Sequence, residues 1–256
     1  MKEKLYTIPL NDAVNADLEC PFCFIERNVE QDLLDFVLGS GSSYMESDVR
    51  GDTDREGFCR THFKKMFDYG NTLGNGWILK THYQKLNQEM KNHFAHFKPQ
   101  KSSQMKKIKK AQPCAPRKNA IGLWTQQKED SCYICKRFAD TYARYLDTFF
   151  YLYEKDITFR KKIQNSKGFC LPHFGDLCEA AEDALSDKQK EDFYNDMFAL
   201  MEKNMERLYE DVSWLIEKFD YRNKDADWKD SKDAVQRGMQ KLKGGFPADA
   251  PYKQNK

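Results

Sequence analysis

The chain has 256 residues, enough for one large domain or two smaller ones with a packed core. Hydrophobic residues make up 40% of it, and its 18 Phe, 13 Tyr and 4 Trp favour a folded globule over a disordered chain. Lysine plus arginine (42) nearly balances aspartate plus glutamate (40). The resulting net charge of +2 excludes a strong overall attraction to nucleic acids or membranes.

The first ten residues are charged and lack the apolar core of a signal peptide. No apolar run approaches the roughly 20 residues that span a bilayer. We therefore expect a cytoplasmic protein without a membrane partner. Thiols stay reduced in that compartment, so the 8 cysteines are expected to be metal ligands or catalytic groups rather than disulfides.

The predicted elements are helices along the whole chain. Apolar residues recur every three or four positions in several stretches, and Gly39 and its serine neighbours end the first of them. Ser186, with Gln189 three residues later, is typical of a helix start. Ser231 is expected to cap a short last helix that Gly244 ends. Strand-like alternation is hard to find, so the predicted fold class is all-α. The periodic stretches are 25–37, 77–90, 138–152 and 193–219.

A Cys-x-x-Cys pair followed by Gly-Phe-Cys-x-x-His occurs twice. The spacing between the second and third cysteines differs by one residue between the copies, and the copies begin about a hundred residues apart. This register predicts an internal duplication of a helical Cys3His unit with pseudo-twofold symmetry. The motifs lie at 20–23, 57–62, 132–135 and 168–173.

Three thiolates and one imidazole are a typical ligand set for Zn²⁺, which binds four ligands tetrahedrally. Pairing ligands within each copy predicts two ions. Site one would contain Cys20, Cys23, Cys59 and His62; site two would contain Cys132, Cys135, Cys170 and His173. Zinc is favoured over an iron–sulfur cluster, which usually takes four thiolates. Four protein ligands leave no position for water, so the sites are predicted to be structural.

The predicted division of the chain follows the repeat. Residues 1–97 form the first Cys3His unit, 98–118 a linker, 119–219 the second unit, and 220–256 a tail with a short helix. The linker contains eight lysines and arginines, three prolines and no acid. A mobile spacer is the simpler interpretation, and a nucleic-acid-binding segment is the alternative, although it lacks the aromatic residues that stack on bases.

Several polar residues have no counterpart in the other copy. Asp48 and Arg50 precede the third ligand of the first copy, and the tail adds Asp220, Arg222, Asn223 and Lys232. A local turn is the simpler interpretation. The alternative is that these residues line one polar cleft. No Ser-His-Asp order, phosphate loop or spaced carboxylate pair is recognisable, so no catalytic residue is predicted and the enzyme hypothesis is disfavoured.

The chain resembles an uncharacterised bacterial family, a domain of unknown function. The resemblance extends over nearly the whole length and rests on the cysteine and histidine motifs together with three others. It implies metal sites but no activity. The other motifs are Tyr-Met-Glu-x-Asp-Val-Arg at 44–50, Lys-Phe-Asp-Tyr-Arg-Asn at 218–223 and Ser-Lys-Asp-Ala at 231–234.

Three functional hypotheses follow from the sequence. The first is a zinc-stabilised scaffold that binds protein or nucleic acid, with the linker at 98–118 or the tail cleft as the contact surface. The second is thiol-based redox chemistry or metal delivery by the same cysteines. The third is an enzyme of unnamed reaction that uses a cleft around Asp48, Arg50, Arg222 and Lys232. The sequence predicts neither the partner nor the oligomeric state.

Overall fold

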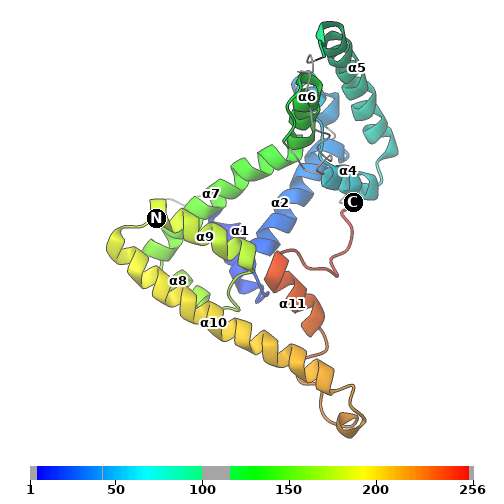
Figure 1. Cartoon of the computed structure of the whole chain (residues 1–256). Helices are drawn as coiled ribbons and strands as arrows, with labels where there is room; N and C mark the ends of the chain where they lie inside the picture. Colours follow the sequence, from blue (N-terminus) through cyan, green and yellow to red (C-terminus); the bar gives the residue numbers. More distant parts are fainter. Residues whose placement is uncertain (1–4, 42, 100–115, 254–256) are drawn as a thin grey trace, which may run out of the picture. The chain divides into compact units, whose positions relative to one another are not determined.

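The computed structural model describes residues 5–41, 43–99 and 116–253. In these ranges the fold is all-α, as predicted, with eleven α-helices, two 3-10 helices and no strand (Figure 1). None of the described helices is long and apolar enough to cross a lipid bilayer. The helices are α1 (Thr7–Asn15), α2 (Pro21–Leu38), α3 (Ser47–Glu56), α4 (Arg60–Tyr69), α5 (Thr72–His96), α6 (Ala120–Asp130), α7 (Tyr133–Lys155), α8 (Ile157–Gln164), α9 (Leu171–Ala184), α10 (Asp187–Glu217) and α11 (Ala234–Lys243), with 3-10 turns η1 (Ser43–Met45) and η2 (Tyr221–Asn223).

The described residues form two compact units, and their boundaries differ from the predicted ones. Unit 1 contains Met1–Glu30 and Ala139–Ala250, and unit 2 contains Gln31–Phe138 and Pro251–Lys256. The helix α2 begins in unit 1 and ends in unit 2, whereas α7 begins in unit 2 and ends in unit 1. Each copy of the repeat therefore contributes to both units, and most of the predicted tail belongs to unit 1.

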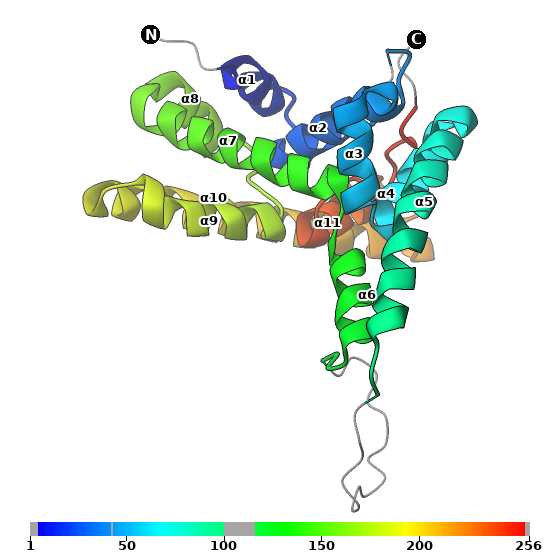
Figure 2. The ribbon, with the colours of Figure 1, turned by 90° about the horizontal axis from the view of Figure 1, so that it is seen from above.

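Unit 2 is built around contacts of α5 with its neighbours. The helices α3, α4 and α6 all pack against α5, and Figure 2 shows α5 and α6 side by side. Its core includes the last turns of α2 and the first residues of α7, with Leu34, Leu38 and Ile134 fully buried. The predicted linker 98–118 lies between α5 and α6. Residues 100–115, with Cys114 and most of the linker lysines, lie outside the described residues.

Unit 1 has a core rich in aromatic rings. Phe149 of α7 lies at its centre, with ring centroids 5.7 Å from Phe22, 6.0 Å from Phe169 and 5.7 Å from Phe159. All four rings are almost completely buried. Offset and edge-to-face contacts of this kind add to the stability gained from burial alone. The aromatic core thus holds the first turn of α2 close to the segment that precedes α9.

The predicted helix boundaries are confirmed at one site and corrected at another. At the start of α10, the backbone N–H of Ser186 donates to Gln189 Oε1 at 3.0 Å, as expected for a capping box. The helix α11, however, begins at Ala234, and the Ser231 hydroxyl donates to the Trp228 carbonyl. Gly244 follows α11 with φ of +76°, a backbone conformation that favours glycine.

Candidate metal centres

All eight predicted ligands lie at the N-terminal ends of four helices. Cys20 and Cys132 directly precede α2 and α7, and Cys59 and Cys170 are the N-cap residues of α4 and α9. The second ligand of each pair follows three residues later, in the first helical turn. The unpaired N–H groups and the dipole of a helix start favour thiolates at these positions. Each pair of ligands that is separated by two residues therefore marks the start of a helix.

The structure pairs the motifs differently from the sequence-based prediction. The Cys-x-x-Cys pair of each copy meets the Cys-x-x-His pair of the other copy. We call the group in unit 1 the buried quartet and the group in unit 2 the open quartet. The predicted sites one and two are therefore wrong in composition, although all eight residues take part. The buried quartet is Cys20, Cys23, Cys170 and His173, and the open quartet is Cys59, His62, Cys132 and Cys135.

The lengths of α2 and α7 explain the exchange. At a rise of about 1.5 Å per residue, the 18 residues of α2 and the 23 residues of α7 extend for about 27 and 35 Å. Each helix carries a Cys-x-x-Cys pair at its start and ends in the other unit. The Cys-x-x-His pair that follows in the chain is therefore in a different unit from the Cys-x-x-Cys pair before it.

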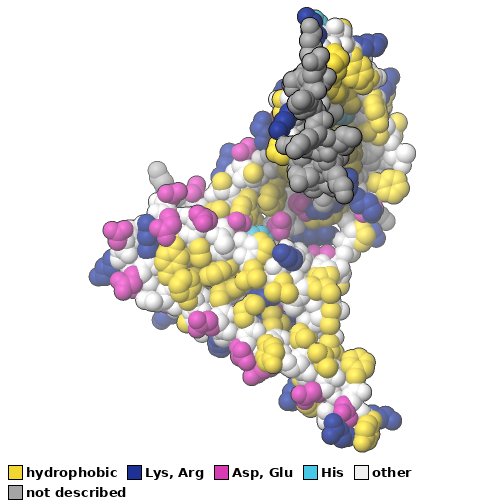
Figure 3. Space-filling model, in the orientation of Figure 1, with side chains coloured by type: hydrophobic (Ala, Val, Ile, Leu, Met, Phe, Trp, Pro, Cys, Tyr) yellow, Lys and Arg dark blue, Asp and Glu magenta, His cyan; other side chains and the backbone are white. Residues whose placement is uncertain are grey.

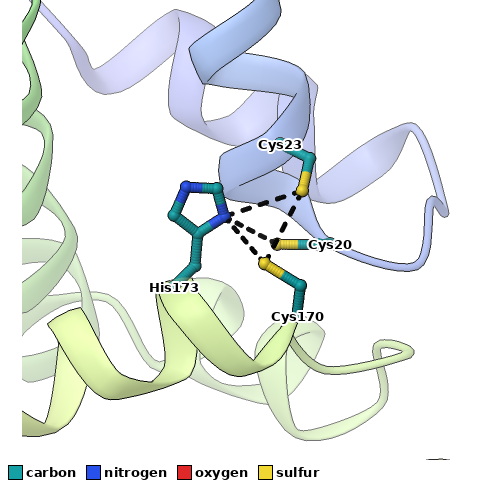
Figure 4. Close-up of side chains that lie close together, drawn as sticks. All are labelled: Cys20, Cys23, Cys170 and His173. Atoms are coloured by element: carbon teal, nitrogen blue, oxygen red, sulfur yellow. Dashed lines mark hydrogen bonds between the residues drawn. The ribbon is translucent and has the colours of Figure 1, made fainter. Parts of the chain in front are cut away.

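The buried quartet surrounds a point between α2 and α9 (Figure 4). His173 Nδ1 lies 3.4 Å from the Cys20 sulfur, 3.6 Å from the Cys23 sulfur and 3.1 Å from the Cys170 sulfur. The Cys23 and Cys170 sulfurs are 3.7 Å apart. None of the four residues is more than 6% exposed. Burial of so many ionisable groups is costly unless they share a cation.

The open quartet has the same geometry at the starts of α4 and α7. His62 Nδ1 lies 3.2 Å from the Cys59 sulfur and 3.3 Å from each of the Cys132 and Cys135 sulfurs. The Cys59 and Cys135 sulfurs are 3.8 Å apart. The backbone N–H of Cys135 also donates to the Cys132 sulfur at 3.5 Å, which is the N-cap hydrogen bond of α7.

These distances match the edges of one coordination tetrahedron. Metal–sulfur bonds of about 2.3 Å and a metal–nitrogen bond of about 2.0 Å imply sulfur–sulfur edges near 3.8 Å and sulfur–nitrogen edges near 3.5 Å. The measured sulfur–sulfur distances are 3.7 and 3.8 Å, far beyond the roughly 2.05 Å of a disulfide bond. All ligand atoms of a quartet lie within 4.8 Å of one another, which suits a single ion. The residues present therefore fit one tetrahedral metal ion in each quartet.

The outer face of the histidine in the buried quartet is positioned by further side chains. Glu26 Oε2 lies 3.6 Å from His173 Nε2, the nitrogen that faces away from the sulfurs. A carboxylate beside the distal nitrogen of a metal-ligating histidine fixes the ring tautomer and increases ligand basicity. The rings of Phe22 and Tyr142 lie 5.8 and 5.7 Å from the imidazole. The aromatic core of unit 1 thus continues directly into the buried quartet.

In each quartet, hydrogen bonds also connect the two chain segments that carry the ligand pairs. In unit 2 the backbone N–H of Tyr133 donates to the Gly57 carbonyl at 2.9 Å. In unit 1 the residue at the matching position is Pro21, which has no N–H to donate. The Lys241 ammonium of α11 makes the link instead, donating to the carbonyls of Glu19 at 2.7 Å and Lys167 at 2.5 Å. The tail helix is therefore part of the support of the buried quartet.

The thiols within each quartet have different pKa values because their surroundings differ. Burial opposes ionisation of Cys132, but the hydrogen bond with His62 lowers the pKa of this thiol to about 6. Burial and the neighbouring Cys132 sulfur raise the pKa of Cys135 to about 12. Although burial opposes ionisation, hydrogen bonds with Cys170 and Cys23 hold the pKa of Cys20 well below its usual range. Mutual repulsion thus disfavours several adjacent thiolates, and a divalent cation at the centre would offset it.

The two quartets differ in exposure to solvent. Cys135 is exposed and Cys59 is half-buried, whereas all four ligands of the buried quartet are enclosed. Cys132 and Cys135 form part of the wall of a wide cavity of about 610 Å³, together with Glu56, Gln127, Asp130, Ser131 and Lys136. Solvent and small reagents therefore reach the open quartet directly.

The predicted polar cleft stays a prediction, because its residues belong to different units. Asp48 and Arg50 lie on α3 in unit 2, whereas Asp220, Arg222, Asn223 and Lys232 lie in unit 1. Locally, Arg222 donates to both carboxylate oxygens of Asp220 at 3.0 and 2.7 Å. The Asn223 side chain donates to the Glu217 carbonyl at 3.0 Å. These contacts stabilise the turn after α10.

The sequence did not predict that three further residues lie near the buried quartet. Glu26 lies one turn after Cys23, on α2, and its spacing from Cys23 could have indicated a neighbouring carboxylate. Lys241 and Gly244 lie in the tail, far from any ligand motif. A Cβ atom on Gly244 would lie 3.6 Å from the Cys170 sulfur, so the backbone after α11 passes close to the quartet. No local sequence signal connects the tail to this site.

The comparisons with known proteins give one match. No curated protein and no solved structure matches the chain. A model of a family of unknown function, DUF6062, matches residues 1–249, which include all eight ligands of both quartets. Because this match covers nearly the whole chain, the protein belongs to the family of unknown function DUF6062.

Proposed function

We propose that the protein is a zinc-binding helical scaffold, in which two structural Cys3His sites fix the helix starts and the remaining surface binds a macromolecular partner. The observation that carries this proposal is the enclosed tetrahedral geometry of the buried quartet. Three sulfurs and one nitrogen supply all four positions of a zinc ion, which leaves none for a reacting water. Such a site contributes to folding rather than to catalysis.

Zinc is favoured over an iron–sulfur cluster by the size and composition of the quartets. The four donors of each quartet are too close together to enclose a cluster of several iron atoms, and one donor in each is an imidazole. A single zinc ion accepts this mixture of sulfur and nitrogen without a preference for another geometry.

Metal analysis of protein purified without added metal tests the proposal. We expect about two zinc ions per chain from the ligand count, no visible absorption, and charge-transfer and d–d bands of a tetrahedral thiolate site after Co²⁺ substitution. A brown protein with bound iron and sulfide would contradict the assignment of zinc. Full retention of the fold after complete removal of metal would contradict the structural role.

A second candidate function, thiol chemistry or metal delivery, is favoured by the exposure of the open quartet. The Cys59 and Cys135 sulfurs, 3.8 Å apart, are accessible enough to react with a peroxide. One hydrogen peroxide and two protons would convert these two thiolates into a disulfide and two waters, and the bound ion would be released. The oxidised sulfurs can no longer bind zinc as thiolates.

Timed release of zinc to a coloured chelator distinguishes the two candidates. Metal delivery or redox control predicts that one ion per chain leaves quickly with dilute peroxide and returns after reduction. The Cys178→Ser variant is the control, because Cys178 belongs to neither quartet. If both ions stay bound while the chain remains folded, the open quartet is structural as well.

A further inference from the structure

The long helix α5 presents an unusual face to solvent. Its inner side, with Gly74 and Ile78, is buried, and His82 contacts the Asp54 carbonyl at 3.0 Å. On that same side, farther along α5, Glu89 forms an ion pair with Lys128 of α6 at 2.7 Å. The opposite side carries a series of exposed residues spaced by three or four positions, which places them on one face. We call this series the α5 outer stripe: Trp77, Lys80, Tyr83, Asn87, Lys91 and Phe94.

Aromatic rings and lysines alternate along the stripe. Tyr83 and Phe94 are 57% and 56% exposed, so their rings face solvent. Lys80 Nζ lies 4.6 Å from the centroid of the Trp77 ring, which brings a positive charge to a flat apolar surface. The stripe extends over about 25 Å of helix, the rise of 17 residues. Yellow and dark blue side chains cover α5 at the upper right of Figure 3.

The stripe contains no acidic residue. The single acid of α5 is Glu89, which lies on the inner side and is paired with Lys128. On α10, by contrast, an exposed helix face carries both charges, because Glu202, Glu206 and Glu210 lie near the exposed Lys203 and Tyr209. A face with exposed rings and only positive charge therefore differs from an ordinary solvated helix surface.

We propose that the α5 outer stripe binds single-stranded nucleic acid. Proteins that bind single strands without base specificity combine aromatic rings, on which bases stack, with positive charges that follow the phosphate backbone. The stripe supplies both in alternation. Protein interfaces use the same aromatic residues but are depleted in lysine, so the lysines favour a polyanion over a protein partner. The zinc assignment is not needed for this inference, because α5 carries no ligand of either quartet.

Fluorescence anisotropy of the full chain with its bound metal tests the inference. The probe is a labelled oligo(dT) or oligo(U) of about 15 nucleotides, titrated at several salt concentrations. We expect saturable binding that weakens with salt. The Tyr83→Ala, Phe94→Ala double variant should bind about tenfold or more weakly, because each stacked ring contributes substantially to affinity. The Lys80→Gln, Lys91→Gln variant should lower the salt slope by about 1.4.

A control variant on another helix tests whether binding depends on the α5 outer stripe or on exposed lysines and rings in general. The Lys203→Gln, Tyr209→Ala variant removes one exposed lysine and one exposed ring from α10 and should bind as the unchanged chain does. Metal content and thermal unfolding are measured on every variant, so that loss of folding is not mistaken for loss of binding.

Three outcomes would overturn the inference. The first is the absence of saturable binding to either oligonucleotide. The second is unchanged affinity in both α5 variants, which would place any binding elsewhere, for example in the linker 98–118. The third is self-association of the chain that disappears in the Tyr83→Ala, Phe94→Ala variant, which would make the stripe a contact between copies. A chain that contains two zinc ions and gives any of these results would leave the metal assignment intact.

Discussion

At the scale of single residues, the ligand quartets give a test of which residues share an ion. Cys20→Ser alone should remove one ion per chain. Adding Cys170→Ser should remove no further ion, because both residues belong to the buried quartet. Adding Cys59→Ser instead should remove the second ion. Metal analysis of the three variants measures these stoichiometries.

The same three variants also test the alternative arrangement, in which all four ligands of an ion come from one sequence copy. That arrangement would give the reverse pattern, with one ion lost from Cys20→Ser, Cys59→Ser and two lost from Cys20→Ser, Cys170→Ser. Cys178→Ser serves as the control and should keep both ions. The comparison depends only on counting ions, so it holds for zinc and for any other metal that the quartets take.

Ligand identity could be predicted from the sequence because it is a local property. A gap of two residues at a helix start directs both side chains to one point, whatever follows later in the chain. The sequence could not predict which ligands share an ion, because this depends on where α2 and α7 end. Periodicity shows that the helix after Cys23 exists, but not that its far end belongs to another unit. Pairing within a copy was the simpler assumption, and it was wrong.

A second prediction at this scale concerns Asp196, whose carboxylate joins three helices of unit 1. Its Oδ2 atom accepts hydrogen bonds from Arg160 of α8 at 3.0 and 2.7 Å, Gln164 of α8 at 2.8 Å and Tyr153 of α7 at 2.5 Å. Burial opposes ionisation, but these hydrogen bonds hold the pKa of Asp196 below its usual value of 3.8. Asp196→Asn should lower the free energy of unfolding at neutral pH by about 2 kcal/mol.

The pH dependence of this effect follows from the direction of the pKa shift. Because the pKa of Asp196 is lower in the folded chain, its contribution is present above the unfolded pKa of about 3.8 and is lost as the pH falls below that value. Thermal unfolding of both proteins should show a difference at pH 7 that narrows below pH 4. A difference that is constant down to acid pH would show that the charge of Asp196 is not what stabilises the contact.

At the scale of elements, the two Gly-Phe-Cys segments need glycine for a conformational reason. Gly57 and Gly168 have φ of +64° and +74°, directly before the segments that lead into α4 and α9. A Cβ atom would lie 2.9 Å from His82 Cε1 at the first position and 3.2 Å from Met201 Sδ at the second. Both the backbone and the neighbours therefore disfavour a side chain.

Alanine substitutions test this requirement. Gly57→Ala and Gly168→Ala should each destabilise the fold by about 1–3 kcal/mol from the positive-φ backbone alone. Gly76→Ala is the matched control, because Gly76 lies inside α5, its φ is ordinary and a Cβ atom there would have no neighbour within 4 Å. That change should stabilise the chain by up to about 1 kcal/mol. Chemical denaturation measures all three, and equal effects at the three glycines would contradict the conformational explanation.

At the scale of the whole molecule, the exchange of motifs means that neither copy can complete a quartet alone. A fragment of residues 1–97 contains Cys20, Cys23, Cys59 and His62, but these belong half to one quartet and half to the other. A fragment of 119–256 has the same deficiency. Each fragment should therefore bind metal weakly and remain largely unfolded, because metal binding and folding are coupled in such sites.

Mixing complementary fragments should restore both quartets. Residues 1–108 and 109–256 divide the chain between α5 and α6, outside every described helix. Together they supply all eight ligands, and each quartet then joins two chains. We expect a one-to-one complex with about two ions, detected by ultracentrifugation and metal analysis, and its dissociation by a chelator. If 1–97 instead folds alone around one tightly held ion, each copy is a self-sufficient metal unit. Because each quartet takes ligands from both motif copies, folding of either site should require both parts of the chain.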